Sequence, residues 1–536
     1  MRLASVVLAL WYWLAIIGPA RATGIETALF AVGTWYAGLG VAGQLLVQVG
    51  VSLALSAASY GLSYLIGGAG KRQQGAQQDT QGTSLPEFDA LLETCRAYGT
   101  ITTAGAVFFH KTIANSGSSG PDRWVFGLAL SEGICDSLVS VSINGAECFF
   151  GPAVGGIQDA VTSPWFDGSI AYMRASFRSG TDTQGVDPII AARFPTPPDE
   201  FYPGDATRTT KWAAFYQRGI CTLVLDMDFG NSADHHAELW GVSYPQLLVR
   251  VRGLRLYDRT DPAQDPDDAT TWTWTDTATV VIEDYLVDDL GGQVDRDAVA
   301  DGAATESIAI DREYIPTLDG SEQRGRINGM VYSSESPIAV LGDMLQMNRG
   351  MLIATEGQYV IRSDRAAAAV ATIHKGQWRD QISSTNEPDT RSLIDGVVAQ
   401  FYPASRYGQS AETAYPAEAL DSPSAERVTF KYCDSAPAAQ RLGFAMMEEN
   451  AVGRTVSGVF DISVLVASGK ANRQIEVGDV VNWDAPAPYD DMNGLYRVDA
   501  LSINSDFSVS LSLTGTSADV IEGWSTDLET PLEAAA

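Results

Sequence analysis

The feature that most constrains the fold is a run of short alternating segments between residues 97 and 150. Apolar and polar residues alternate, or apolar residues run together, in residues 105–111, 124–130 and 138–143. Glycine, serine and asparagine separate these segments, which is the pattern of strands joined by turns. The last turn, Asn144-Gly145, is a strong hairpin signal because both positions favour positive φ. We therefore expect the three segments to form a small antiparallel sheet.

Composition and charge narrow the class of protein. At about 150 residues per domain, 536 residues correspond to roughly three or four domains, and 45% hydrophobic residues suffice for several cores. The 66 acidic residues outnumber the 35 basic ones, for a formal net charge of −31. Nucleic-acid-binding domains are usually basic, so we expect no sequence-specific nucleic-acid binding. The five cysteines form no CxxC pair, which argues against a zinc site and predicts buried free thiols for at least four of them.

The first 66 residues are almost free of charge. The ionised side chains there are Arg2, Arg21 and Glu26. Residues 3–17 resemble the apolar core of a signal peptide, and a second apolar run rich in Gly and Ala spans residues 28–66. Each run is long enough to cross a bilayer as a helix. Three interpretations stay open: a cleaved signal followed by an anchor, a resident membrane protein, or an apolar hairpin buried against partners in an assembly.

Period-two segments dominate the rest of the chain, and helices are few. Helical spacing predicts helices at residues 277–290, with Thr275 or Asp276 as the cap, at 337–347 and at 436–454. In the second of these, Ile338, Leu341, Met344 and Leu345 share one face, and Pro337 occupies the first turn. Strands are predicted at residues 478–481, 494–501 and 507–514. The pattern predicts a mainly β protein with short helices (a β-rich α+β class), built of barrel-like or sandwich-like domains.

One strand carries a group of basic residues. Arg250 and Arg252 lie on one face of the alternating segment 247–257, and Arg255 lies on the other face unless Gly253 marks a bulge. A basic pair can bind phosphate. The many aspartates that follow this segment favour a salt-bridged sheet surface instead.

Residues that could carry catalysis or hold a metal are sparse. The sequence has no GxSxG, HExxH or Walker motif, and no GxGxxG that opens a helix after a strand. The densest group of metal-ligand types is Asp226, Asp228, Asn231, Asp234 and His235. Clusters of this kind arise by chance among 66 carboxylates, so we assign no catalytic, cofactor-binding or metal-binding residue, and whether this group binds a cation stays open. We expect no enzymatic activity and no cofactor.

Several stretches, taken in order, resemble the central tail hub, or tip-attachment, proteins of long non-contractile bacteriophage tails. The stretches are AYGTITTAGAVFF and LALSEGICDSLVSVSING (97–145), VRGLRLYD, TWTW and DYL (251–286), RINGMVYSSESP and YVIR (326–362), LIDGVVAQFY (393–402), APAAQRLGFAMMEENAVGR (436–454), and VGDVV, GLYRVDAL and FSVSLSLT (477–514). Each motif alone has low specificity, whereas their joint order is quite specific.

The resemblance implies a structural virion protein. A hub of this family is a homotrimer that closes the distal end of the tail tube, contacts the distal tail protein, the tape-measure protein and other tail-tip proteins, and opens to release the tape measure and DNA. Receptor recognition would then belong to a separate fibre, and residues 1–66 would be buried in the tail tip or contact the host membrane. A secreted or membrane-anchored acidic β-rich hydrolase of the bacterial envelope is the alternative.

The expected organisation has six parts. They are an apolar Gly/Ala-rich helical segment (1–70), a polar linker (71–84), a first hub β-domain with an inserted β-rich region (85–260), a second hub domain with a strand–helix–hairpin pattern (261–375), a third barrel-like hub domain (376–520) and a C-terminal tail (521–536).

Overall fold

The computed structural model describes residues 93–531, apart from residues 114–121, 199–204, 231–232, 242–244, 356, 381, 386–392, 404–405, 407, 468–473 and 488. The expected apolar segment, the linker and residues 532–536 lie outside this range. Within it, none of the helices combines the length and the apolar character that crossing a bilayer requires. The fold is mainly β with short helices, as the sequence predicts.

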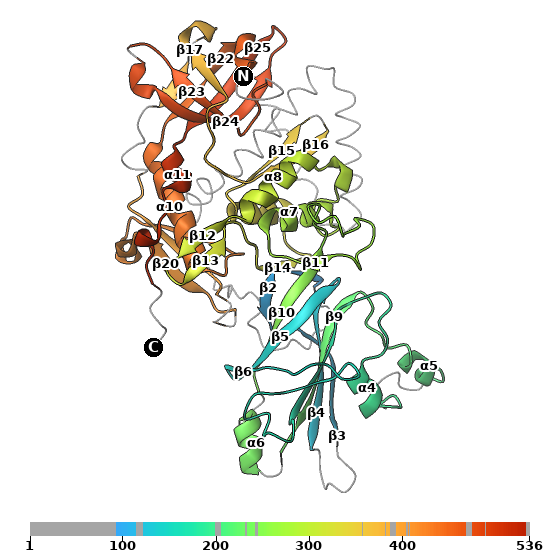
Figure 1. The fold of residues 1–536 in the computed structure, drawn as a ribbon. Coiled ribbons are helices and arrows are strands. Elements are labelled where there is room, and N and C mark those ends of the chain that lie inside the picture. The colour runs from blue at the N-terminus through green and yellow to red at the C-terminus, as the bar shows by residue number, and fades with distance from the viewer. Residues whose placement is uncertain are drawn as a thin grey trace, which may run out of the picture.

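An antiparallel five-stranded sheet with the order β3-β4-β9-β8-β7 forms one end of the molecule (Figure 1). Its strands are β3 (Ala106–Ile113), β4 (Arg123–Glu132), β9 (Ile220–Asp228), β8 (Met173–Arg178) and β7 (Gln158–Asp159). The helices of this region are α4 (Pro188–Arg193), α5 (Arg208–Trp212) and α6 (Ala233–Trp240). Alternate side chains of β9 belong to two cores: Leu225 to the main core and Val224 to a smaller one that includes Ile190 of α4 and Trp212 of α5. The sheet is therefore covered on both faces.

The three segments expected to form one sheet are divided between two sheets. β3 and β4 pair as predicted, but β5 (Cys135–Ile143) pairs with β10 (Leu247–Leu256) instead of β4. The second sheet has the order β11-β10-β5-β6, with β2 also on β10; its remaining strands are β11 (Thr273–Trp274), β6 (Ala146–Cys148) and β2 (Thr100–Thr103). Alternation specifies which face of a strand is buried but not which strand lies beside it, so the prediction of a single sheet was wrong. The hairpin between β5 and β6 is confirmed, with Asn144 and Gly145 at φ 52° and 88°.

A bulge in the second sheet lies on β5 and not at Gly253. Arg250 pairs with Ser140 and Val251 with Leu138, so β5 carries the extra residue. Gly253 has a different role, because a Cβ there would lie 2.1 Å from the carbonyl oxygen of Ala97. The Gly253 amide donates to the Gly99 carbonyl at 2.7 Å. The missing side chain thus lets β1 (Cys95–Tyr98) pass close to β10.

The helical region follows β10 and sits in the middle of the molecule (Figure 1). Its helices are α7 (Ala278–Val287), α8 (Asp301–Asp311) and α9 (Pro337–Gln346), with a short 3-10 turn, η1 (Arg296–Ala298), before α8. Its strands form pairs: β1 with β14 (Gly329–Tyr332), β12 (Tyr314–Thr317) with β13 (Gly320–Gln323), and β15 (Met351–Thr355) with β16 (Gln358–Arg362). The predicted strand, helix and hairpin between residues 327 and 362 are confirmed.

Two details of these helices differ from the prediction. The residue at the N-terminal cap of α7 is Thr277, one position after the expected Thr275/Asp276 pair. On α9, Val340, Met344 and Leu345 are buried, while Ile338 is 64% exposed. Ile338 follows Pro337 at the first turn of the helix, beyond the part that packs on the core.

A three-stranded sheet and a long helix come next. The sheet has the order β20-β19-β21, with β20 (Ala411–Tyr415), β19 (Val397–Phe401) and β21 (Glu426–Thr429). α10 (Ala436–Val452) packs on this sheet, begins at the Ser435 cap and ends at Gly453, which has φ 49°. The predicted helix at 436–454 is confirmed. A 3-10 turn, η4 (Ala417–Asp421), lies between β20 and β21.

A six-stranded sheet with the order β17-β23-β24-β25-β22-β18 forms the other end of the molecule (Figure 1). Its strands are β17 (Ala371–His374), β23 (Val480–Asp484), β24 (Gly494–Ile503), β25 (Ser508–Gly515), β22 (Thr455–Asp461) and β18 (Ser383–Thr385), with 3-10 turns η2 (Lys375–Gln377), η5 (Ile462–Leu465) and η6 (Asp490–Met492). Val509, Leu511 and Leu513 of β25 are buried, as their alternation with serines predicts. After β25 the chain returns through α11 (Ala518–Glu522) and η7 (Thr526–Leu528) to α10, where Gln440 and Thr530 exchange hydrogen bonds of 2.8 and 2.9 Å.

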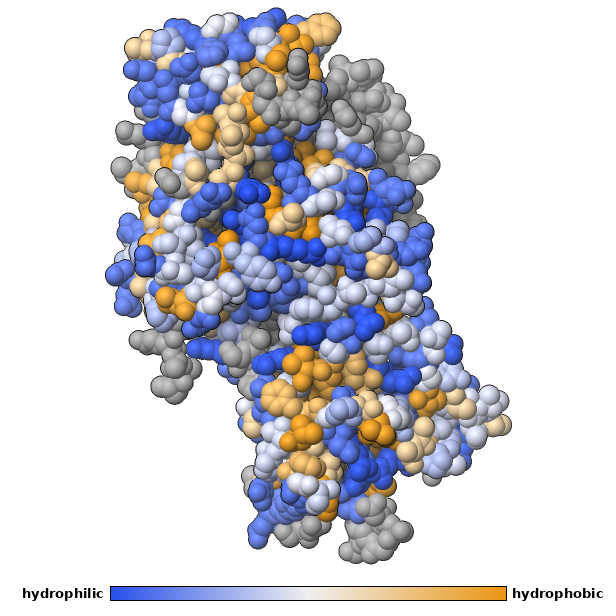
Figure 2. All heavy atoms as spheres, in the orientation of Figure 1, coloured by the Kyte–Doolittle hydropathy of each residue, from blue (hydrophilic) through white to orange (hydrophobic). Residues whose placement is uncertain are grey.

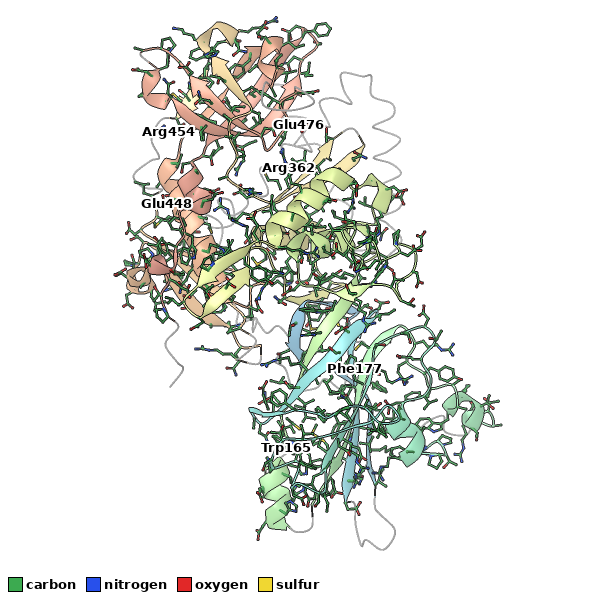
Figure 3. The ribbon with its side chains drawn as sticks, in the orientation of Figure 1. Trp165, Phe177, Arg362, Glu448, Arg454 and Glu476 are labelled. Carbon is green, nitrogen blue, oxygen red and sulfur yellow. The ribbon has the colours of Figure 1, made fainter. Side chains whose placement is uncertain are left out.

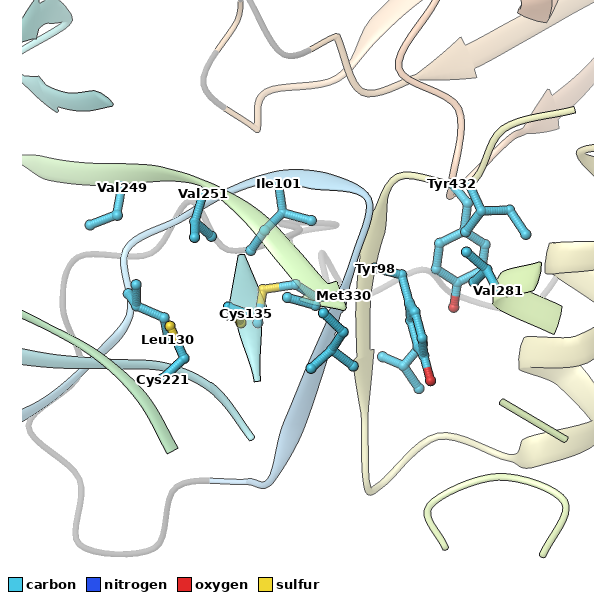
Figure 4. Packing of buried hydrophobic residues seen from close by; sticks show 14 of the residues in the cluster. Tyr98, Ile101, Leu130, Cys135, Cys221, Val249, Val251, Val281, Met330 and Tyr432 are labelled. Carbon is cyan, nitrogen blue, oxygen red and sulfur yellow. The ribbon is translucent and has the colours of Figure 1, made fainter. Parts of the chain in front are cut away.

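Two large clusters of buried side chains hold the structure together. The first runs through both five-stranded sheets and α7–α9 to Leu442 of α10, and Figure 4 shows part of it, with Cys221 beside Leu130 and Cys135 near Val251 and Ile101. The second lies within the six-stranded sheet, around Trp483, Tyr496 and Leu511. All five cysteines are free and four are buried, as expected. The domain boundaries near residues 260, 375 and 520 stay predictions.

Candidate functional site

The group of acidic residues at the end of β9 is arranged around arginines. Both oxygens of Asp226, which is 2% exposed, accept hydrogen bonds from guanidinium groups. Arg123 of β4 donates to Oδ1 at 3.0 Å, and Arg193 of α4 donates to Oδ2 at 3.0 and 2.7 Å. Arg123 also pairs with Asp228, which stands opposite it in the sheet. The two arginines supply the positive charge and the donors that a buried carboxylate requires.

The other members of the sequence cluster take different surroundings. Asn231 lies outside the described residues. Asp234 and His235 lie on α6, where the His235 ring contacts the Tyr172 ring edge-on, with centroids 4.7 Å apart. Among the described residues, no group of three His, Cys, Asp or Glu side chains is placed to hold a metal ion. The sequence reasoning found Asp226 but missed Arg123 and Arg193, because neither is near it in the chain and no motif links them.

The basic residues of β10 form the salt-bridged sheet surface that the sequence predicts. Arg250 pairs with Glu147 at 2.7 Å, and Arg255 pairs with Asp136 at 3.1 Å. The Arg252 guanidinium lies 4.8 Å from the centre of the Trp274 ring, a cation–π contact. Their charges are used within the protein, which disfavours a phosphate site on this strand.

The helical region contains a buried carboxylate that has no cationic partner among the described residues. Asp311, which has no solvent exposure, accepts hydrogen bonds from the backbone amide (2.7 Å) and hydroxyl (2.6 Å) of Thr279 and from the Ser363 hydroxyl (2.8 Å). The Asn348 amide lies 3.4 Å away. Burial raises the pKa of Asp311 to about 6, although these hydrogen bonds partly offset the effect. The arrangement joins α7, α8 and the residue after β16 through one side chain.

Carboxylates also line the contact between β1 and α7. The Tyr98 hydroxyl donates to Asp284 at 3.0 Å, and Arg96 pairs with Asp288 at 3.0 Å. Burial raises the pKa of Asp288 to about 6, and it also raises the pKa of Asp284. These contacts join β1, the strand that precedes β2 and β3 of the two five-stranded sheets, to α7 of the helical region.

Exposed apolar side chains gather on the segment that follows β6. Phe149, Val161 and Ile170 are 44%, 52% and 51% exposed, and Val154 is 81% exposed. The Val161 amide donates to the Phe149 carbonyl at 2.9 Å, so these two residues lie on adjacent chains. Figure 2 shows apolar residues on the surface of the part of the molecule where Figure 1 places β5 and β6. Contiguous exposed apolar patches are typical of surfaces that contact other proteins, and Phe149 and Val161 are neighbours of this kind.

Comparison with known proteins supplies a structural relative. No protein-family model matches the chain, and no curated protein matches its sequence. A solved chain from the virion of a native gene transfer agent particle superposes with a TM-score of 0.53 and 14% identity. The match covers 96% of this chain and 100% of that one. This protein has the fold of that virion component.

Two further solved structures match more weakly. A tail protein from Neisseria meningitidis MC58 has a TM-score of 0.29 at 10% identity, covering 70% of this chain and 96% of that one. The prophage tail protein gp18 from Listeria monocytogenes EGD-e has a TM-score of 0.25 at 12% identity, covering 74% and 84%.

Proposed function

We propose that the chain is a structural component of a phage-type tail and, within it, the trimeric hub that closes the distal end of the tail tube. The observation that carries the proposal is the fold shared over nearly the whole length of both chains with a component of a gene transfer agent virion. The ordered hub-like motifs between residues 97 and 514 support it independently. The protein would act by binding other tail proteins and by opening to release the tape measure and DNA.

The chemistry of the described residues fits a structural role better than hydrolysis. The buried acidic residues are bound by arginines, hydroxyl groups and backbone amides, and none of these arrangements presents a paired acid and base in a cleft. The exposed apolar residues after β6 would supply a surface for protein contacts. A hub would use such surfaces for its own copies, the distal tail protein and the tape-measure protein. Receptor binding would belong to a separate fibre.

Localisation and copy number in purified particles test the proposal. A peptide tag after Ala536 would be detected with gold-labelled antibody, and copies per particle would be counted by quantitative mass spectrometry. A hub predicts label at the distal tail tip and three copies per tail. Label along the tube or at the head, or a copy number that is not a multiple of three, would exclude the hub and leave a different tail role. Absence from particles, with hydrolase activity in the culture fluid, would favour the alternative.

In the proposed hub, the first 66 residues are the part that contacts the host membrane. Two apolar runs followed at once by Lys71 and Arg72 fit a segment that is buried in the tail tip and inserts in the host bilayer on release. Truncation of residues 1–70 tests this. Particles that assemble but fail to deliver DNA would support insertion. Particles that do not assemble, or that infect normally, would contradict it.

A further inference from the structure

The six-stranded sheet has its own core. We call residues 371–385 and 455–515, which form this sheet, the C-terminal sheet domain, and the remaining described residues the body. The core of the domain, around Trp483 and Leu511, has no residue in common with the main core of the body. Two cores that are each complete can keep their internal packing while the units around them change orientation.

Charged side chains join the two units at one end of the hairpin β15–β16. Arg362, the last residue of β16, donates to the Val477 carbonyl at 2.8 Å and to Asp479 Oδ1 at 3.1 Å. Figure 3 shows Arg362 of the body on the side of the molecule where Glu476 of the sheet domain lies. Asp479 is 4% exposed, and its other oxygen accepts from the Glu476 amide at 2.8 Å. Arg362 therefore completes the hydrogen bonding of a buried carboxylate that belongs to the other unit.

A second charged contact is shared between the units. Glu449, on the last turn of α10, pairs with Arg349 of the body at 2.7 Å. The same oxygen of Glu449 lies 3.8 Å from Arg497 of β24, and Arg497 in turn pairs with Asp499 at 3.1 Å. One carboxylate thus holds an arginine from each unit.

The chain crosses between the units where its backbone is suited to bending. Gly453, at the end of α10, is left-handed with φ 49°, a conformation in which glycine is not strained. Gly515, at the end of β25, lies beside it, because its amide donates to the Arg454 carbonyl at 2.7 Å. The chain therefore enters the sheet domain after Gly453 and leaves it after Gly515 at neighbouring positions. The crossing at residues 364–370 is a short alanine-rich segment without helix or strand, and the crossing after β18 includes residues 386–392, which lie outside the described residues.

From these contacts we infer that the C-terminal sheet domain is a hinged unit. It turns about Gly453 and Gly515, and its closed position is held by Arg362 on Asp479 and the Val477 carbonyl and by Arg497 on Glu449. Neither contact contributes to the two apolar cores, so removing the arginines should release the closed position without unfolding either core.

The distance between two spin labels on the full chain tests the hinge. Ile338→Cys on α9 and Val466→Cys after η5 provide the sites, because these side chains are 64% and 61% exposed. The native cysteines are buried or half-buried, and labelling of the chain without these substitutions checks that they stay unreacted. The measurement compares the double variant Arg362→Ala/Arg497→Ala with the control variant Arg379→Ala. Arg379 pairs with Asp461 at 2.9 Å, and both residues lie within the sheet domain.

We expect a single narrow distance in the chain with native arginines and in the Arg379→Ala control. The double variant should lose that peak and show a broad or displaced distribution, with circular dichroism unchanged. If the double variant misfolds, the single variant Arg497→Ala, which leaves Asp479 paired with Arg362, should show a smaller broadening. A narrow, unshifted distance in the folded double variant, or in the single variant where only that one folds, would overturn the hinge.

Discussion

The body and the C-terminal sheet domain differ in where their carboxylates lie: the body buries several, and most of those in the sheet domain are exposed. In the body, several carboxylates lie within the packed structure, each less than 9% exposed: Asp187, Asp226, Asp258, Glu283 and Asp311. In the described part of the sheet domain, Asp479 is the buried carboxylate, and it lies at the junction with the body. The pairs Arg379–Asp461 and His374–Asp484 of the sheet domain are exposed.

This difference follows the way each unit is assembled. β23, β24 and β25 pair in the order in which they follow one another, so turns specify two of the five strand pairings of the sheet domain, while β17, β22 and β18 are joined by long-range pairing. The body joins segments that are far apart: Arg123 and Asp226 are separated by 103 residues, and Ser363 and Asp311 by 52. A buried carboxylate without hydrogen-bond donors costs on the order of several kcal/mol of stability. An arrangement of the body that separates a carboxylate from its donors is therefore less stable than the native one. We infer that buried carboxylates specify the long-range packing of the body.

Removal of Arg123 should give the largest effect. In Arg123→Ala, the buried Asp226 loses one of its two guanidinium partners and Asp228 loses its own. The free energy of unfolding should fall by about 3–5 kcal/mol, measured by chemical denaturation. Arg174→Ala, which breaks the exposed pair with Asp159 on the same sheet, is the control and should cost less than about 1 kcal/mol. Equal losses in the two variants would contradict a special role for the buried pair.

Asp311→Asn should change the pH dependence of stability. The pKa of Asp311 is raised to about 6 in the folded protein from an ordinary value of 3.8, so the folded state binds this proton more tightly. The corresponding stabilisation is complete below pH 3.8 and is lost as the pH rises through about 6. Between about pH 4 and 7, the unfolding free energy of the native chain should therefore fall by about 2 kcal/mol relative to the variant. Denaturation curves with a constant difference across this range would show that Asp311 does not titrate in this way.

Gly453→Ala tests the point where the two units meet. A side chain at φ 49° is strained, so the unfolding free energy should fall by about 1–2 kcal/mol. Gly376→Ala is the matched control, because no atom lies within 4 Å of the added Cβ and φ is not in the left-handed region. That substitution should leave stability nearly unchanged. A similar loss of unfolding free energy in both variants would mean that the left-handed backbone conformation at Gly453 is not the cause of the loss there.

Arg379→Ala should have the smallest effect. Its pair with Asp461 has side chains that are 42% and 36% exposed, and ion pairs open to water contribute little. The denaturation midpoint should stay within experimental error of the native value, at low and at high salt. A clear shift of the midpoint would remove the contrast between a body that depends on its ion pairs and a sheet domain that does not.

Local patterns predicted much of the secondary structure but fewer of the contacts. The hairpin at Asn144-Gly145, the helices beginning at Pro337 and Ala436 and the strands after Gly478 are where the sequence placed them. The partner of β5, the exposure of Ile338 and the pairing of β1 with β14 were not predicted. Turn chemistry and alternation act within a few residues, whereas these three features depend on which distant segment arrives beside them.

The sequence by itself determined the mainly β character, the free buried cysteines, the salt-bridged surface of β10 and the order of hub-like motifs. Each of these depends on residue types and their spacing along the chain. The tertiary structure alone decided that Asp226 is bound by Arg123 and Arg193, that Asp311 lies among hydroxyl groups, and that Arg362 reaches Asp479 of another unit. Those contacts join residues that no local pattern links, and their strength depends on burial, which only the folded chain creates.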